Sequence, residues 1–417
     1  MKKEKTPNIR FKKFEHNWFK DCLSKVSKSI EYGLNASAKD YDGIHKYLRI
    51  TDIDESSRLF LADKLSSPDV NFTIEDFENY KLQKNDLLFA RTGASVGKTY
   101  LYRESDGEVY YAGFLIRARL RDSYDGNFIF QQTLTGKYKQ FIEITSQRSG
   151  QPGVNGKEYG EWNIGVTSYP EQTAIGSLFR TLDDLLTSYK DNLANYQSLK
   201  ATMLSKMLPK AGQTVPEIRL EGFEGEWENI RLGDCAIIKG RLGWKSLKQE
   251  EYTEVGPSMI AGKHIKNGVI DWEEVDHIPQ WRYDESPEIM LEEGDIIFSK
   301  DGSLGNPALV SNLKGEATIN STMMLVRLDK EVSSQFFYQI LASSVFQKLI
   351  YLKVSGSSIP HLFQADMQGF KFYAPSIEEQ QAIGKYFTNL DNLIASHQEK
   401  ISQLEILKKK LLQDMFI

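Results

Sequence analysis

Two stretches of the chain carry apolar residues at alternating spacings of four and three, which is the pattern of one face of a long helix. Pro170 precedes the first stretch and Pro209 follows it, as expected at helix boundaries. The heptad spacing predicts a coiled-coil seam along each helix. The first seam comprises Leu182, Leu186, Tyr189, Leu193, Tyr196, Lys200, Met203 and Met207, and the second comprises Leu390, Ile394, His397, Ile401, Leu404, Lys408, Leu411 and Met415.

The remaining apolar runs are short, β-branched or aromatic, and bounded by Gly and Asp, which predicts strands. These runs lie at 86–90, 109–120, 295–299 and 322–328. Residues 126–141 and 333–352 instead carry helical spacing. We therefore expect an α+β fold for each globular part of the chain.

The chain repeats itself with an offset of about 208 residues. Glu171-Gln172-Thr173-Ala174-Ile175-Gly176 returns as Glu379-Gln380-Gln381-Ala382-Ile383-Gly384, and the match continues along both helices. The globular parts match only at scattered positions, such as 86–93 with 295–302. A tandem duplication follows, with globular domains at 1–168 and 210–375 and helical spacers at 169–209 and 376–417. The conserved helices share one task, whereas the diverged globular domains have different targets.

Two arrangements of the helices agree with this pattern. Each helix could pack on its own domain, or the two could pack on each other as an antiparallel pair, which the duplication favours. Lys200 and Lys408 fall at equivalent seam positions, where a polar residue can fix the register.

A length of 417 residues with 40% apolar and 26% charged residues indicates a folded chain of at least two domains. No apolar run approaches the ~20 residues of a membrane span, and the polar start predicts no signal peptide, so we expect a cytoplasmic protein. Two cysteines exclude a disulfide framework. Residues 1–168 carry 26 Lys/Arg against 23 Asp/Glu, while 209–375 carry 17 against 24. Any DNA contact in the second half must therefore use local basic patches or another subunit.

Several motifs approach a catalytic signature without completing it. The segment Gly93–Thr99 is one residue short of a phosphate-binding P-loop, and a turn between strands is the default interpretation. Asn306-Pro307-Ala308-Leu309 lacks the second proline and the aromatic residue of an adenine-methyltransferase motif. The six histidines show no metal-ligand spacing. We expect no catalytic or metal site in this chain.

Polar loops favour binding instead. The segment 146–157 is rich in Gln, Asn, Arg, Ser and Gly, and 353–361 occupies the matching place in the second copy. Such side chains can pair with base edges or phosphates, although an ordinary surface loop explains the composition equally well. Arg91-Thr92-Gly93 and Lys300-Asp301-Gly302 both follow a predicted strand. A guanidinium such as that of Arg91 can bond phosphate or guanine through two nitrogens.

Together these features resemble the specificity (S) subunit of a type I restriction-modification system, the HsdS family, over residues 7–417. The resemblance rests on the duplication, the Glu-Gln-x-Ala-Ile-Gly helix openings, the strand-turns at 86–93 and 295–302, Ser149-Gly150-Gln151-Pro152-Gly153 and the segment 407–415. It implies that each globular segment is a target-recognition domain for one half of a split, asymmetric target in double-stranded DNA. It also implies that the helices set the gap and dock two methyltransferase (M) subunits.

The resemblance further implies a non-catalytic chain without a cofactor of its own. S-adenosylmethionine, ATP and Mg are expected on the M subunits and the restriction (R) subunits, and no membrane is involved. The net negative charge of the second domain departs from the pattern of the family. It argues against strong DNA binding by this domain alone. The alternative is a helical scaffold that joins two protein-binding domains without DNA contact.

Residue assignments follow from these loops and seams. We expect DNA contacts from Arg49, Arg91, Thr92, Lys98, Arg148, Gln151, Asn155, Lys157, Lys263, His264, Lys300, Lys353, Ser357 and Ser358. We expect subunit-interface contacts from Leu182, Leu186, Tyr189, Leu193, Tyr196, Leu390, Ile394, His397, Ile401 and Leu404.

Overall fold

The computed structural model describes residues 6–147, 151–210, 212–242, 247–355 and 361–417. It divides into two compact units, each of mixed α+β structure. The first unit comprises residues 1–192 together with 397–417, and the second comprises 193–396. Two helices of 38 residues, α5 (Tyr169–Lys206) and α11 (Ile377–Asp414), occupy nearly the whole predicted spacers, and each is divided between the units.

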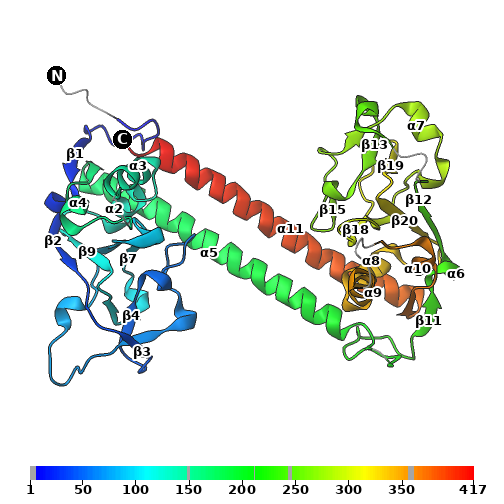
Figure 1. Cartoon of the computed structure of the whole chain (residues 1–417), viewed down its shortest axis with the longest axis horizontal. Coiled ribbons are helices and arrows are strands. Elements are labelled where there is room, and N and C mark those ends of the chain that lie inside the picture. The colour runs from blue at the N-terminus through cyan, green and yellow to red at the C-terminus, as the bar shows by residue number, and fades with distance from the viewer. Residues whose placement is uncertain (1–5, 148–150, 211, 243–246, 356–360) are drawn as a thin grey trace. The chain divides into compact units, whose positions relative to one another are not determined.

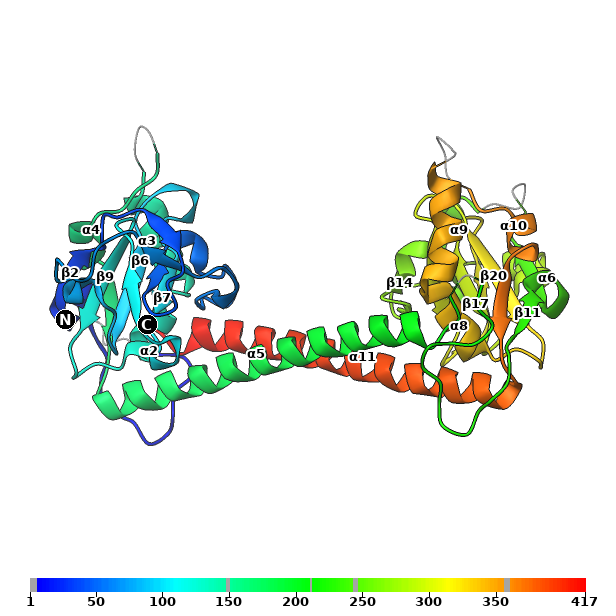
Figure 2. The ribbon, with the colours of Figure 1, turned by 90° about the horizontal axis from the view of Figure 1, so that it is seen from below.

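The first unit is built on a four-stranded antiparallel sheet in the order β2-β9-β6-β7 (Figures 1 and 2). Its strands are β2 (Ser27–Tyr32), β9 (Leu115–Leu120), β6 (Asp86–Ala90) and β7 (Thr99–Leu101). Leu87 and Phe89 of β6 enter one hydrophobic core, while Leu88 and Ala90 enter another on the opposite face. Because both faces of β6 are covered, this strand is a continuous apolar run in the sequence.

Smaller elements complete the first unit. The helices are α1 (Leu23–Val26), α2 (Gly126–Gln132), α3 (Gly136–Thr145) and α4 (Gly156–Gly160). The paired strands are β1 (Phe19–Cys22) with β10 (Asn163–Val166), β3 (Ala38–Asp40) with β5 (Ser66–Pro68), and β4 (Lys46–Leu48) with β8 (Val109–Tyr111).

The second unit repeats this plan with the sheet order β12-β20-β17-β18 (Figures 1 and 2). Its strands are β12 (Ala236–Gly240), β20 (Met323–Leu328), β17 (Ile296–Ser299) and β18 (Gly305–Leu309). The helices are α6 (Leu232–Cys235), α7 (Gln280–Asp284), α8 (Ser334–Ala342), α9 (Ser344–Ser355) and α10 (Gln364–Gln368). The other strands are β11 (Glu228–Arg231), β13 (Thr253–Ile260), β14 (Ile265–Lys266), β15 (Val269–Ile270), β16 (Asp276–His277), β19 (Ala317–Ile319) and β21 (Lys371–Ala374).

The predicted α+β class, the predicted strands and the repeat are confirmed, but several elements are shorter than expected. The helical segment 126–141 is broken into α2 and α3, because the hydroxyl of Thr135 caps a new helix at the amide of Tyr138. The segment 333–352 is likewise broken between α8 and α9. The predicted strand 109–120 is two strands, since the chain turns at Gly113.

The Glu-Gln-x-Ala-Ile-Gly openings anchor each long helix to its own globular domain. Glu171 accepts two hydrogen bonds from the guanidinium of Arg10, at 2.6 and 2.8 Å, and Gln172 accepts one from the amide of Asp125 at 3.1 Å. The equivalent bonds recur in the second unit, where Glu379 accepts from Arg219 and Gln380 from the amide of Ser333. The repeated motif therefore attaches each long helix to its globular domain through the same hydrogen bonds.

The last part of the motif is a glycine because the helix approaches its domain closely. A Cβ atom at Gly176 would lie 2.3 Å from Oδ1 of Asp125 and 3.1 Å from the amide nitrogen of Phe128. At Gly384 it would lie 2.8 Å from Cβ of Gln335. Any side chain at these two positions would force the helix away from its domain.

Within each unit, segments of α5 and α11 run antiparallel, as predicted. In the first unit the ring of Tyr189 lies 5.3 Å from that of His397, and Lys408 pairs with Asp183. In the second unit Lys200 pairs with Asp391, and Met207 shares a core with Phe387. Every residue of both predicted seams is buried or half-buried, whereas most residues between them are exposed.

The far end of α11 also completes the core of the first unit. The ring of Phe416 packs against Phe128, Phe179 and Trp18, with ring centroids 5.5, 5.7 and 6.3 Å away. Met415 belongs to the same core. Trp18 and its repeat equivalent Trp227 are buried, so both are core residues as expected.

Candidate nucleic-acid interface

The structure brings together two of the polar loops that the sequence singled out in the first unit. The turn after β6 lies beside the segment that leads into α4. The amide of Gly93 donates to the carbonyl of Pro152 at 3.0 Å, and the amide of Val154 donates to that of Arg91 at 2.9 Å. Thr92 and Gly153 form an isolated β-bridge. We call residues 91–93 and 151–157 the first paired loops.

Arg91 is the best-placed cation of the first paired loops. Its guanidinium lies over the ring of Tyr32 at 5.2 Å and near that of Phe114 at 5.8 Å, and both rings are exposed. The hydroxyl of Tyr32 in turn accepts a hydrogen bond from the amide of Gly156 at 3.0 Å. Among the described residues no carboxylate lies within 4 Å of Arg91. Two rings therefore hold a guanidinium that has no ionic partner in the described part of the chain.

Tyr32 and Phe114 were not predicted as site residues. They lie on β2 and in the β8–β9 turn, far in sequence from the polar loops. No motif distinguishes them from the other aromatic residues of this chain. Only the close approach of the sheet edge to the first paired loops identifies them.

The other residues of the first paired loops divide into exposed and structural ones. Gln151 and Lys157 are exposed. Asn155 caps α4 instead: its side-chain oxygen accepts from the amide of Glu158 at 3.0 Å, while its own amide donates to the Glu158 carboxylate at 2.8 Å. The cap explains why Asn stands at this position.

Two predicted contacts are bound to neighbouring acids. The ammonium of Lys98 lies 2.7 Å from the carboxylate of Glu55 and is largely buried. Arg49 bonds Asp52 through two nitrogens, at 2.8 and 2.9 Å, and this bonding raises the pKa of the Arg49 guanidinium. The segment Gly93–Thr99 is a turn between β6 and β7, as expected, with Gly93 in the left-handed region at φ +75°.

The second unit has the same loop arrangement with different chemistry. The amide of Leu362 donates to the carbonyl of Lys300 at 2.9 Å, and Asp301 forms a β-bridge with His361. We call residues 300–302 and 361–363 the second paired loops. The ammonium of Lys300 lies 2.7 Å from the carboxylate of Asp301, which also bonds the ring of His361. Burial raises the pKa of Asp301, but the bonds from Lys300 and His361 outweigh it and hold that pKa below its usual value.

The remaining predicted contacts of the second unit are also paired or buried. Lys353 lies 2.7 Å from Asp366, and Lys263 lies 2.9 Å from Asp276. The side chain of His264 is only 2% exposed, and its Nδ1 accepts from the amide of Ala261. This burial argues against a surface contact by His264. Arg148, Ser357 and Ser358 lie outside the described residues.

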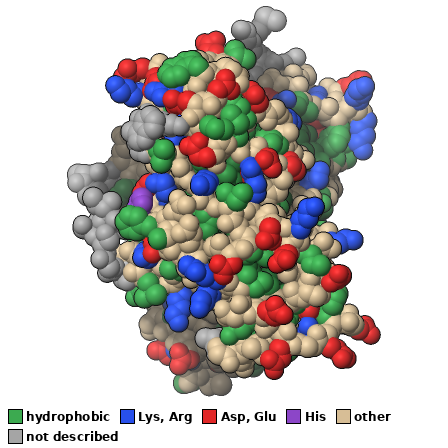
Figure 3. All heavy atoms as spheres, turned by 90° about the vertical axis from the view of Figure 1, so that its right-hand side faces the viewer, with side chains coloured by type: hydrophobic (Ala, Val, Ile, Leu, Met, Phe, Trp, Pro, Cys, Tyr) green, Lys and Arg blue, Asp and Glu red, His purple; other side chains and the backbone are tan. Residues whose placement is uncertain are grey.

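The face of the second unit in Figure 3 shows acidic and basic side chains interspersed, without a broad basic area. This agrees with the net negative charge of the second domain. Among the described residues, no group of three His, Cys, Asp or Glu side chains is placed to hold a metal ion. Nor is any helix in the described ranges sufficiently long and apolar to span a membrane.

The predicted subunit-interface residues face the other helix of the same chain. Leu182, Leu186 and Leu390 are buried and the other seven predicted interface residues are half-buried, so they are not a free surface for another subunit. Four exposed leucines of the helices stand next to seam positions. Leu185 and its repeat equivalent Leu393 are both 42% exposed, while Leu199 and Leu407 are 41% and 44% exposed. Their equivalence at an offset of 208 residues was the signal that the sequence carried for them.

Comparison with known proteins finds similarity to the specificity subunits of type I restriction enzymes. Residues 224–406 match the model of the type I restriction modification DNA specificity domain. The chain is 20% identical to the type I restriction enzyme MjaVIII specificity subunit of Methanocaldococcus jannaschii, over 90% of this chain and 85% of that protein. It is 28% identical to the EcoAI specificity subunit of Escherichia coli, over 48% of this chain and 33% of that protein.

The fold has a solved counterpart. The crystal structure of the type I restriction-modification S subunit from M. genitalium matches with a TM-score of 0.68 at 18% identity, over 99% of both chains. The repeat, the paired helices and these similarities agree with one another. Over most of its length the chain is similar to specificity subunits of type I restriction-modification systems, and its residues 224–406 match their DNA specificity domain.

Proposed function

We propose that this chain recognises a bipartite sequence in double-stranded DNA, with the paired loops of each unit contacting one half of the target. One observation carries the proposal: in each unit the turn after the equivalent strand, β6 or β17, is hydrogen-bonded to a second loop, and the residues on these loops differ between the units. A shared scaffold with different side chains suits two different half-sites. Arg91, Gln151 and Lys157 are the contacts that we propose for the first half.

Arg91→Ala tests this assignment. In a complex with M subunits, the variant should weaken binding. If Arg91 contacts a phosphate, the salt dependence should fall by about one unit of slope; if it contacts guanine, discrimination at one position should fall by about 1–3 kcal/mol. Lys84→Ala is the matched control, because Lys84 is exposed at the opposite end of β6. An unchanged affinity and an unchanged methylated motif for Arg91→Ala would exclude Arg91 as a contact.

Two further experiments decide between this proposal and the scaffold alternative. A complex that binds random and cognate duplexes equally, with or without this chain, would favour a scaffold without DNA contact. A change of only one half of the methylated sequence, after residues 1–168 are exchanged for another recognition domain, would favour the modular proposal.

We further propose that the exposed leucines beside the seam dock two M subunits, which supply methyl transfer, and that R subunits supply cleavage. This chain then needs no cofactor of its own, while S-adenosylmethionine, ATP and Mg belong to those partners. Equivalent leucines on both helices present the same apolar surface twice, which suits two copies of one partner. Leu185→Ser with Leu407→Ser should reduce the number of M subunits that co-purify from two to one. Ile144→Ser, which changes an exposed residue of α3, is the control. Methyl transfer by the purified chain alone would contradict the non-catalytic role.

A further inference from the structure

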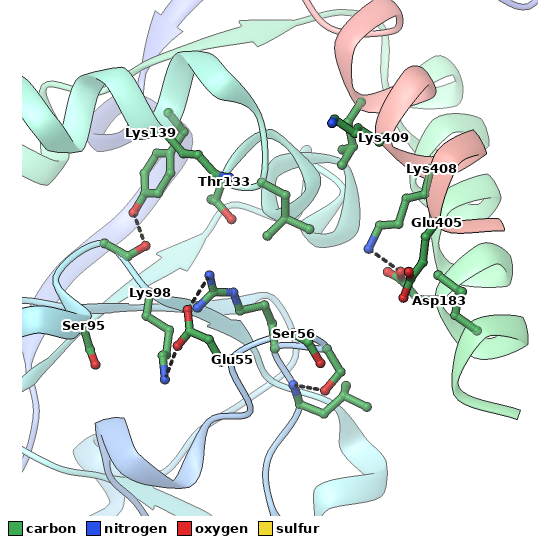
Figure 4. Close-up of a pocket in the computed structure, with 18 of the residues that line it drawn as sticks. Glu55, Ser56, Ser95, Lys98, Thr133, Lys139, Asp183, Glu405, Lys408 and Lys409 are labelled. Atoms are coloured by element: carbon green, nitrogen blue, oxygen red, sulfur yellow. Dashed lines mark hydrogen bonds and ion pairs between the residues drawn. The ribbon is translucent and has the colours of Figure 1, made fainter. Parts of the chain in front are cut away.

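A cavity of about 500 Å³ lies in the first unit, apart from the paired loops (Figure 4). Its walls come from the loop 55–59, the turn 94–98, the segment from Thr133 into α3, and the neighbouring parts of α5 and α11. Leu134, Ile142, Leu186 and Leu412 provide apolar lining. A concave, partly apolar site of this volume suits a ligand the size of a nucleotide.

Basic side chains outnumber acidic ones around this cavity. The basic ones are Arg58, Lys98, Arg103, Lys139, Lys190, Lys408 and Lys409, against the four acids Glu55, Glu143, Asp183 and Glu405. Three of the cations are neutralised by three of the acids: Lys98 by Glu55, Lys190 by Glu405 and Lys408 by Asp183, at 2.5 to 2.7 Å. Lys139 and Lys409 have no carboxylate within 4 Å among the described residues. The cavity therefore retains unpaired positive charge.

Arg58 adds a second, independent sign of a ligand. Its Nη1 is buried and has no hydrogen-bond partner in the described part of the chain, while its Nη2 lies 3.3 Å from Glu55. The backbone of Arg58 is left-handed at φ +59°, a conformation that is unfavourable for a side chain of this size. The carboxylate of Asp54 holds this loop by accepting from the amides of Ser56 and Ser57. Arg58 thus lines the cavity from a strained loop, and one nitrogen of its guanidinium is buried without a hydrogen-bond partner among the described residues.

The second copy shows that the fold does not need these charges. At an offset of 208 residues, Tyr138 and Ile142 become Phe346 and Ile350, and the pair Asp183 and Lys408 becomes Asp391 and Lys200. The packing residues and the ion pair are thus kept. The cations differ: the equivalents of Lys139, Lys190 and Lys409 are Gln347, Gln398 and Ala201. The same helical packing therefore forms without the charges, which leaves a binding role for them.

We propose that this cavity binds a phosphate-bearing anion of nucleotide size, with Arg58, Lys139 and Lys409 as its phosphate contacts. The ligand phosphate belongs either to a free nucleotide or to the backbone of DNA. This site is separate from the paired loops, so it does not depend on the DNA-recognition proposal.

The test uses the full chain with three probes: inorganic pyrophosphate, ATP and a duplex of random sequence, each titrated by calorimetry at low salt. The double variant Lys139→Gln, Lys409→Ala takes the residues of the second copy, so it should fold normally, as thermal unfolding will check. We expect it to lose at least tenfold in affinity for one class of probe. Lys410→Ala, at an exposed neighbour outside the cavity lining, is the matched control and should change affinity by less than twofold.

The three probes distinguish the source of the phosphate. Loss of ATP and pyrophosphate binding with unchanged duplex binding identifies a free ligand, while loss of duplex binding alone identifies DNA backbone. Arg91→Ala should leave ATP and pyrophosphate binding unchanged, which separates this site from the proposed recognition loops. Equal affinities of the double variant and Lys410→Ala for all three probes, or no binding of any probe by the natural chain, would overturn the proposal.

Discussion

The ammonium of Lys408 lies 2.5 Å from the carboxylate of Asp183, so a residue of the second helical copy is bonded to a residue of the first. The repeat equivalents Lys200 and Asp391 form the same bond at 2.6 Å in the second unit. A glutamine from the neighbouring globular domain also bonds each aspartate, Gln131 to Asp183 and Gln339 to Asp391. Each seam lysine therefore pairs with one particular aspartate, and this pairing fixes the register of the two helix segments.

Lys408→Ala and Asp183→Ala should be coupled in their effects on stability. Both side chains are 18% exposed, so either single change should cost about 1–3 kcal/mol, because it leaves a largely buried charge without its partner. The double variant should cost less than the sum, with a coupling near ~1 kcal/mol in a urea-unfolding cycle. Lys190 and Glu405 provide the control, since they are 44% and 52% exposed and their coupling should stay below about 0.5 kcal/mol. Equal couplings for the two pairs would argue against a special role of the seam lysine.

Glu171→Gln should lower the stability of the first unit in a pH-dependent way. Burial raises the pKa of Glu171, but the bonds from Arg10 and Thr167 outweigh burial and hold that pKa below its usual value. A lowered pKa in the folded state stabilises the protein above the unfolded-state value of about 4.3, and this stabilisation is lost as the pH falls through the folded-state pKa.

We therefore expect the variant to be less stable by about 1.5–3 kcal/mol at pH 7, which is the contribution of hydrogen bonds to a charged group. The difference should hold down to about pH 5 and shrink below about pH 4. Urea unfolding across this range measures it, with Glu161→Gln, an exposed glutamate, as the control. A difference that persists unchanged at pH 3 would show that the charge of Glu171 is not its source.

The two cysteines should react at very different rates. The hydroxyl of Ser24 bonds the sulfur of Cys22 at 3.2 Å and lowers its pKa, whereas burial raises the pKa of Cys235 to about 11. Because the thiolate is the reactive form, Cys22 should react at pH 8 while Cys235 stays protected. An aromatic disulfide reagent should titrate one thiol in the folded chain and two in guanidinium. In Cys22→Ser the fast-reacting thiol should disappear; its persistence would contradict the assignment.

Gly176→Ala should destabilise the chain although alanine is the better helix former. The added Cβ would meet the carboxylate of Asp125 and the backbone of Phe128, so α5 must shift from its domain. We expect a net loss of about 1–3 kcal/mol despite a gain of roughly 1 kcal/mol in helix propensity. Ser177→Ala, at the exposed next position of the same helix, should be neutral or slightly stabilising. A stabilised Gly176→Ala variant would show that α5 and its domain can move apart at little cost.

The long helices and the sheets could be predicted because their patterns are local. Heptad spacing marked the seams, and the continuous apolar run of β6 marked a strand covered on both faces. The break between α2 and α3 was missed because the cap by Thr135 adds only a local signal inside an otherwise helical spacing. The Glu-Gln-x-Ala-Ile-Gly motif is visible in the sequence. Its structural role is not, because its partners Arg10 and Asp125 are distant in sequence.

The candidate site was predictable only in part. The sequence singles out the turns after β6 and β17 and the loops that precede the helices, because two copies carry polar residues at matching places. The structure places these segments side by side within each unit, and their role as DNA contacts stays a prediction. Sequence does not show which cations already have acids beside them, so Lys98 and Arg49 were grouped with Arg91. The sequence also does not show that Tyr32 and Phe114 lie beside Arg91. This contact depends on how the edge of the sheet packs against the loops.

The packing of Met415 and Phe416 into the first core has a consequence for protein synthesis. A ribosome finishes residues 1–192 long before it makes these two, with the whole of the second unit in between. At about 5–20 residues per second that interval lasts roughly 10–40 s. During it Trp18, Phe128 and Phe179 lack their partner, while the second unit, a single continuous segment, already has all of its own residues. The part of the chain that is translated first therefore completes its core only after the whole of the second unit has been made.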